Sequence, residues 1–118
     1  MKLAQFRKIM QNFPFFQVIK YMHSLECIPV NRNISDYYFI RYDEIEDRLY
    51  VPYGISMDNN KRIYPTTISG EECHNYDLYY IINYPKEKDC VEHISNLIKK
   101  IKELQVEQKI KDIQNDFN

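Results

Sequence analysis

Apolar residues recur every three or four positions over residues 1–13, which is the spacing of an amphipathic helix. They are Leu3, Phe6, Ile9, Met10 and Phe13. Pro14 then interrupts the row, and proline is well tolerated at the first position of a helix. The sequence therefore predicts a second helix from Pro14, with a strand over residues 16–21 as the alternative. The buried face of that helix would consist of Phe15, Ile19 and Met22.

Segments rich in tyrosine and β-branched residues follow, separated by turn formers, and each predicts a strand. They span residues 36–42, 48–55, 62–68 and 77–84. The short connections between them favour antiparallel neighbours. Pro52 and Pro65 each lack an N–H donor, so the two strands that contain them are expected at an edge or in irregular positions.

From Lys86 to about Ile113 the chain has no proline or glycine, which predicts one long C-terminal helix. Its apolar residues form two rows: Ile94, Leu97, Ile101 and Leu104, then Val106, Ile110, Ile113 and Phe117. At 3.6 residues per turn, a helix rotates by roughly 200° from Leu104 to Val106. The first row can cover a sheet. The second must contact something else, unless the chain folds back after a break near Gln105.

These elements predict an α+β fold in a single domain over residues 1–118. One or two N-terminal helices precede a four-stranded antiparallel β-meander, and a long C-terminal helix follows it. Residues 105–118 are predicted to form a projecting helical tail.

Several of the predicted strands carry apolar or aromatic residues on both sides. Tyr79 and Ile81 alternate with an apolar row, and Tyr50 does the same in its own strand. The N-terminal helices could cover one face of the sheet and the C-terminal helix the other. Alternatively, one face is left as an aromatic patch for a partner. Tyrosine suits such a patch, because its ring gives contact area while its hydroxyl tolerates water.

The composition is that of an ordinary globular protein, with 44% hydrophobic and 28% charged residues. No apolar stretch has the length of a membrane span, and the N-terminal residues lack the apolar stretch of a signal peptide. The three widely separated cysteines fit reduced thiols, which predicts a cytoplasmic protein. Enrichment in Ile, Asn, Lys and Tyr indicates an AT-rich genome and no particular chemistry.

Two cysteine–histidine pairs have the spacing of metal ligands on one face of a helix. His23 and Cys27 are four residues apart, and Cys90 and His93 are three apart. Meeting in space, they would complete a tetrahedral zinc site. No Cys-x-x-Cys motif occurs, however, and a free cysteine is often a small buried apolar residue. Zinc is therefore the less favoured interpretation.

Sequence features of known catalytic sites are scarce. Gly54 and Gly70 are too far apart for a phosphate-binding loop. The acidic residues 43–47 lack the spacing of a calcium-binding EF-hand and are typical of a solvated turn. No cysteine has a signature of nucleophilic catalysis. We therefore predict a protein that is not an enzyme and has no cofactor.

Single-stranded nucleic acid is the main competing ligand class. Basic residues lie among aromatic residues near the N-terminus, namely Arg7, Lys8, Lys20 and Arg32. Exposed tyrosines could stack on bases. However, residues 35–85, which contain the predicted strands, carry four basic and nine acidic side chains, a net charge that repels phosphate.

The sequence thus predicts a small non-enzymatic protein-interaction module that docks on a larger macromolecule. Its small size and its AT-rich codon composition, seen as enrichment in Ile, Asn, Lys and Tyr, suggest an inhibitor or regulator from a phage or mobile element. The predicted partner contacts are Tyr50, Tyr79, Ile81, Ile110, Ile113 and Phe117. The partner is expected to be a protein, and a homodimer through the C-terminal helix is one version; no membrane contact is predicted. A single-stranded nucleic-acid-binding accessory protein and a small zinc-stabilised domain are the alternatives.

Overall fold

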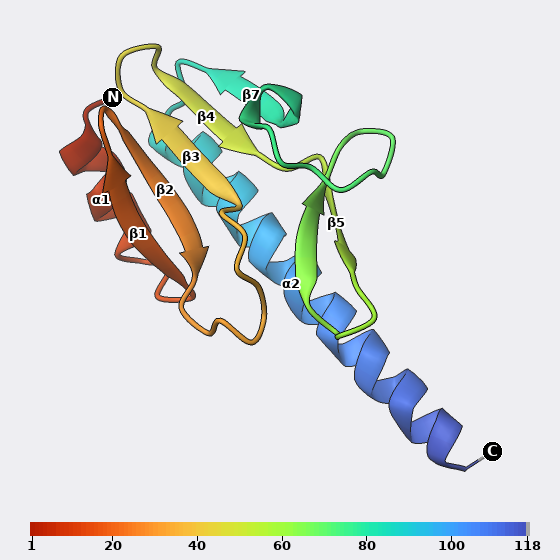
Figure 1. Cartoon of the computed structure of the whole chain (residues 1–118). Coiled ribbons are helices and arrows are strands. Elements are labelled where there is room, and N and C mark those ends of the chain that lie inside the picture. The colour runs from red at the N-terminus through yellow and green to blue at the C-terminus, as the bar shows by residue number, and fades with distance from the viewer. Residues whose placement is uncertain (118) are drawn as a thin grey trace.

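A five-stranded antiparallel sheet with two helices on one of its faces dominates the fold, in the order β1-β2-β3-β4-β7 (Figure 1). The computed structural model describes residues 1–117. The elements are α1 Leu3–Met10, β1 Phe16–Tyr21, β2 Ser24–Pro29, β3 Ile40–Asp43, β4 Arg48–Val51, β5 Gly54–Met57, β6 Ile63–Thr66, the 3-10 turn η1 Tyr76–Leu78, β7 Tyr80–Asn83 and α2 Glu87–Asp116. Strands β5 and β6 form a separate two-stranded sheet. The predicted α+β class is confirmed, with one strand more in the main sheet than expected.

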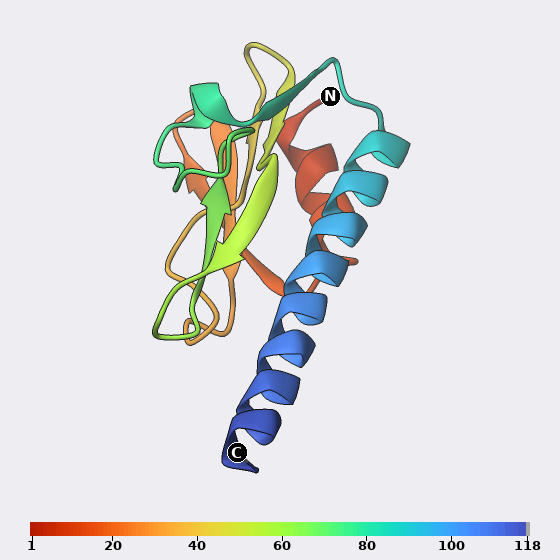
Figure 2. The ribbon, with the colours of Figure 1, turned by 90° about the vertical axis from the view of Figure 1, so that its right-hand side faces the viewer.

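The two helices pack on the same face of the sheet, which we call the helix face (Figure 2). Strand register aligns Leu25, Tyr42, Leu49 and Ile82 in one row across β2, β3, β4 and β7. Phe6 of α1 stacks on Tyr42, with ring centroids 5.1 Å apart. The core thus forms between one side of the sheet and the apolar stripes of α1 and α2. The buried residues of α2 are Cys90, Ile94, Leu97 and Ile101.

The second N-terminal helix is wrong, and its alternative is right: residues 16–21 are strand β1. Strand β1 pairs with β2 along its whole length, from Phe16 opposite Pro29 to Tyr21 opposite Ser24. The hairpin turns at Met22, whose φ is 54°. Strand β2 has no counterpart among the predicted elements. Pairing with β2, between residues 3 to 13 positions apart in the sequence, outweighs the helical spacing of Phe15, Ile19 and Met22.

The predicted strand over residues 48–55 is divided in two at Pro52. Its first half, β4, belongs to the main sheet, whereas its second half, β5, pairs with β6. Pro65 lies within the two-stranded sheet, opposite Ile55. Both prolines therefore occupy the irregular or edge positions that their missing N–H groups predict.

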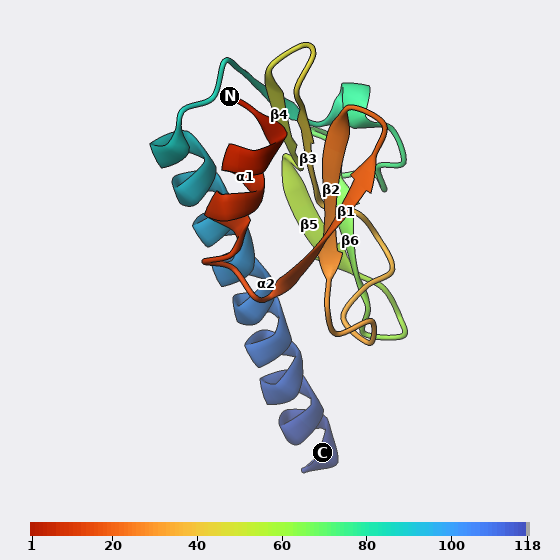
Figure 3. The same ribbon diagram turned by 90° about the vertical axis from the view of Figure 1, so that its left-hand side faces the viewer.

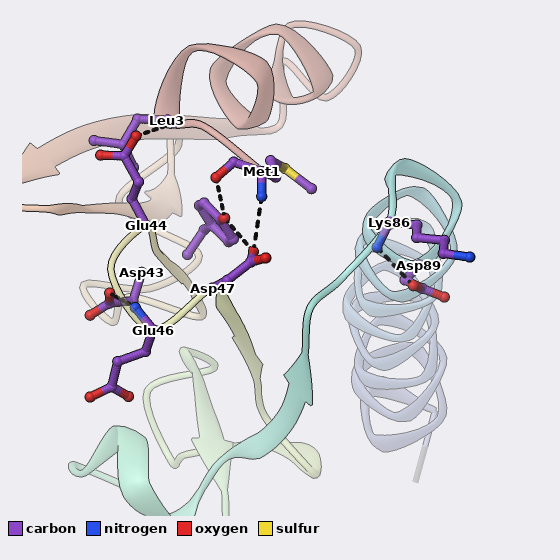
Figure 4. Close-up of polar contacts among 9 residues, drawn as sticks. Met1, Leu3, Asp43, Glu44, Glu46, Asp47, Lys86 and Asp89 are labelled. Atoms are coloured by element: carbon purple, nitrogen blue, oxygen red, sulfur yellow. Dashed lines mark hydrogen bonds and ion pairs between the residues drawn. The ribbon is translucent and has the colours of Figure 1, made fainter.

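Two of the acidic residues in the turn 43–47, Glu44 and Asp47, contact the N-terminal segment (Figure 4). The amino group of Met1 and the hydroxyl of Tyr42 lie 3.1 and 2.5 Å from Oδ1 of Asp47. The backbone N–H of Leu3 donates to Oε1 of Glu44 at 3.5 Å, at the start of α1. This turn therefore helps to hold α1 against the sheet.

Helix α2 runs unbroken from Glu87 to Asp116 and extends beyond the strands (Figure 3). Asp89 accepts a hydrogen bond from the backbone N–H of Lys86 at 2.9 Å, at the start of this helix (Figure 4). The chain makes no turn back near Gln105. Within residues 1–117, no helix combines the length and the apolar content that crossing a membrane requires.

Candidate interaction site

The face of the sheet opposite the helices, here called the outer face, is covered in part by the chain's own loop. Residues 67–79 connect β6 to β7 and lie on this side of the sheet (Figure 2). Cys73 and Tyr79 from this segment pack against Tyr50 of β4. The structure thus matches neither arrangement expected from the sequence: both helices cover one face, and a loop covers part of the other.

This loop changes the position of the predicted sheet contacts. Tyr50 and Tyr79 are only 6% and 5% exposed, so they are not surface residues of the free chain. Ile81 is half-buried against the same cluster. The expectation of an open aromatic face at these three residues is therefore corrected, because alternation along a strand does not show which loop crosses it.

Tyrosine rings and one arginine pack closely beneath the loop. The ring of Tyr76 lies 5.9 Å from that of Tyr50 and 5.0 Å from that of Tyr79, both edge-on. The hydroxyl of Tyr79 donates to the carbonyl oxygen of Tyr38 at 2.9 Å. The guanidinium carbon of Arg41 lies 5.7 and 5.3 Å from the ring centroids of Tyr50 and Tyr76, within the range of a cation–π contact.

Beside this cluster, a pocket of about 240 Å³ opens on the outer face. Tyrosines form much of its wall, and two carboxylates face it. Its lining residues are Glu26, Asp36, Tyr37, Tyr38, Cys73, His74, Tyr76 and Tyr79. Burial, and secondly the negative charge of Glu26, raise the pKa of Tyr76. The pKa of Tyr37 is raised to about 12, by burial and by its hydrogen bond to Glu72.

Sequence reasoning missed this pocket. Glu26 is the only charged residue of β2. A charged residue in an otherwise buried strand can indicate a binding site, but only once the strand itself is known. The other residues come from separate loops that only the folded chain brings together.

The C-terminal half of α2 presents the second apolar row to solvent. Val106, Ile110, Ile113 and Phe117 are 55%, 50%, 57% and 86% exposed. Ile110 follows the buried Ile101 by nine residues, which places it roughly 180° around the helix. The opposite side of this segment is polar: Asp112 accepts from Gln108 at 3.0 Å and pairs with Lys61 of the β5–β6 turn at 2.8 Å. The exposed row therefore faces away from the sheet.

The cysteine–histidine pairs do not form a metal-ligand set. Cys27 and Cys90 are completely buried in the core on the helix face, whereas His23 lies in the exposed turn between β1 and β2. His93 stacks on Tyr80, with centroids 5.7 Å apart. Burial raises the pKa of Cys90 to about 11. Among the residues that the structure describes, no group of three or more potential ligands comes together.

The basic residues proposed for nucleic acid are spread over three elements. Arg7 and Lys8 are exposed on α1, Lys20 is exposed on β1, and Arg32 follows β2. The guanidinium of Arg32 donates to Oε1 of Gln17 at 2.7 Å. Arg7 and Lys8 line two separate shallow pockets, so the four basic residues do not share one site.

Comparisons with family models, with curated proteins and with solved structures find no match to this chain.

Proposed function

We propose that this chain is a small non-enzymatic protein-interaction module that docks on a larger protein through the C-terminal half of α2. The docking element is residues 105–117, called the tail below. The observation that carries the proposal is the exposed row of four large apolar side chains, which faces away from the sheet. Exposed apolar patches of this kind mark interaction sites in monomeric proteins.

The spacing of the row suits an apolar groove. Ile110, Ile113 and Phe117 follow Val106 at positions four, seven and eleven, the pattern with which an amphipathic helix fills a groove. By heptad geometry, the flanks of the row are polar and carry both charge signs. The flanking residues are Glu107, Lys109, Gln114 and Asp116. We therefore propose a partner with an apolar groove and a rim of mixed charge.

The amount of apolar surface favours a foreign partner over a second copy. A tail-to-tail pair would bury the row twice, on the order of 600–700 Å² if each side chain loses about 80 Å². Stable protein interfaces bury about 1,200–2,000 Å². A groove that surrounds the helix covers more surface per side chain, so one tail is enough for it. The homodimer is the competing outcome of the experiment.

We also propose where the protein acts and from what kind of genome it comes. The three cysteines are free thiols, which supports a cytoplasmic protein. The enrichment in amino acids with AT-rich codons and the small size of the chain support an inhibitor or regulator from a phage or mobile element.

The test compares the wild type with two single variants of equal charge change. Ile110→Asp places a carboxylate in the apolar row, whereas Asn115→Asp adds the same charge on the opposite side of the helix. In affinity capture from native-host extract, the wild type and Asn115→Asp should retain the same partner, and Ile110→Asp should lose it. Equal retention by all three would overturn the proposal.

Analytical ultracentrifugation of the purified chain supplies the second measurement. A monomer at micromolar concentration is expected for the wild type. A wild-type dimer that Ile110→Asp abolishes would replace the foreign partner by a second copy of this chain.

A further inference from the structure

The pocket on the outer face has the lining of a site for an organic cation. Four of its eight lining residues are tyrosines, and Glu26 and Asp36 add carboxylates. The faces of aromatic rings attract cations, and cages of such rings recognise alkylated ammonium groups. An anion would be repelled by the carboxylates. The lining therefore favours a positively charged ligand with an apolar surface.

Glu26 is the group that distinguishes this pocket from an ordinary gap between tyrosines. It lies directly opposite Arg41 in the register of β2 and β3. Arg41 instead contacts Asp43 at 3.4 Å and the rings of Tyr50 and Tyr76. Within residues 1–117, the Glu26 carboxylate forms no ion pair or hydrogen bond with the protein. A half-buried carboxylate without a cationic partner favours a ligand that supplies one.

The charges around the pocket support the same sign of ligand. Its lining contains two carboxylates, those of Glu26 and Asp36, and no lysine or arginine, so the negative charge of the wall exceeds its positive charge. Arg62 neutralises Asp36 at 2.6 Å, and Tyr37 donates to Glu72. Glu26 is thus the carboxylate left for a ligand.

The volume limits the size of that ligand. Pockets for drug-sized molecules measure about 300–1,000 Å³, and this one measures about 240 Å³. A nucleotide or a steroid would exceed it, whereas a single alkylammonium head group fits. We propose that this pocket binds an alkylammonium cation between its tyrosine rings, with its charge against Glu26.

This site is independent of the tail. The pocket lies on the outer face, and α2 lies on the opposite side of the sheet (Figure 2). Binding to the pocket can therefore succeed or fail whatever the tail does, and Ile110→Asp is expected to bind the cation as the wild type does.

The experiment titrates the purified chain with choline and with 3,3-dimethylbutanol, its neutral isostere of nearly equal shape. Shifts of tyrosine ring protons in NMR spectra report binding. Choline should bind at least about tenfold more tightly than the alcohol, the scale of one cation–π contact with a partly screened ion pair. Equal binding of the two, or shifts with neither, would overturn the proposal.

Two isosteric variants test the role of Glu26. Glu26→Gln removes the carboxylate charge and should weaken choline binding about tenfold. Glu92→Gln removes an exposed charge from α2 on the other side of the sheet and should leave binding unchanged. Far-UV circular dichroism shows whether each variant is folded. If Glu26→Gln is misfolded, Tyr76→Leu takes its place, because it removes a ring of the pocket wall. Wild-type affinity in folded Glu26→Gln, or in folded Tyr76→Leu, would contradict the site.

A last arm distinguishes a free small molecule from a side chain of another protein. A glycine peptide with one central lysine is compared with butylammonium, which has the same cationic group. Tighter binding of the peptide identifies a protein side chain as the source. Equal affinity identifies a free cation, and binding of neither these cations nor choline excludes the site.

Discussion

Replacing Tyr42 by phenylalanine should destabilise the fold by about 1–2 kcal/mol at neutral pH. The ring of Tyr42 is fully buried and stacks on Phe6, and phenylalanine keeps both features. Only the hydroxyl is lost, which lies 2.5 Å from Oδ1 of Asp47 and 2.7 Å from the carbonyl oxygen of Met1. The hydroxyl has one proton, and donation to the carboxylate is the charge-assisted choice.

The magnitude follows from the type of bond and the exposure of its acceptor. A hydrogen bond to a charged group contributes about 1.5–3 kcal/mol. The side chain of Asp47 is 26% exposed and keeps its contact with the amino group of Met1, so water and that group replace part of the lost bond. The lower part of the range is therefore expected.

The effect should also depend on pH. The Tyr42 hydrogen bond is the largest cause that lowers the pKa of Asp47 from its ordinary value of 3.8. A carboxyl with a lowered pKa stabilises the folded state above its unfolded-state pKa, and this contribution is lost as the pH falls through the folded-state pKa. The difference between the wild type and Tyr42→Phe should thus be constant near neutral pH and shrink below about pH 4.

Urea unfolding at pH 7 and pH 3, followed by far-UV circular dichroism, measures both effects, since the chain has no tryptophan. Tyr21→Phe is the control, because Tyr21 is exposed, and its unfolding free energy should stay within about 0.5 kcal/mol of the wild type. A Tyr42→Phe variant as stable as this control, or a difference equal at both pH values, would refute the role of the Tyr42–Asp47 bond.

Three further outcomes are expected. Ile94→Ala should lower the unfolding free energy by about 2–5 kcal/mol, because Ile94 is fully buried. Ile110→Ala in the exposed row should change it by less than about 0.5 kcal/mol. Urea unfolding of both variants checks these values. Tyr79→Phe removes the bond to the carbonyl of Tyr38 and should cost about 0.5–1.5 kcal/mol, with faster amide hydrogen exchange in residues 67–79 as the specific readout. Thiol titration should find no reactive cysteine in the native chain and three in urea, because all of them are buried; they are Cys27, Cys73 and Cys90.

Local periodicity was enough to predict α1, α2 and the exposed tail. The spacing of Leu3, Phe6 and Ile9 and the long stretch without proline or glycine are properties of neighbouring residues. The two rows of α2 differ in phase by simple helix geometry. The exposure of Ile110 and Ile113 could therefore be predicted without coordinates.

The β1–β2 hairpin could not be predicted in the same way, because a helical spacing overlaps its first strand and its turn lacks a sequence signal. Residues 16–21 satisfy a helical spacing and a strand alternative equally well, and the pairing with β2 decides between them. The turn at Met22 adopts a positive φ without the glycine or asparagine that normally marks such a turn. Likewise, no pattern in residues 67–79 shows that this loop crosses the outer face and buries Tyr50.

The two sides of α2 explain why the tail does not simply fold onto its own domain. Its sheet-facing line changes from apolar at Ile101 to polar at Gln108 and Asp112, and Asp112 is held by Lys61. Turning the apolar row toward the sheet would require a rotation of the last turns by roughly 180°, which breaks the helix and that ion pair. An exposed ion pair contributes little, but the backbone hydrogen bonds broken by such a rotation would be costly. The free chain therefore keeps Ile110 and Ile113 in water, and a groove on another protein can bury them without changing the helix.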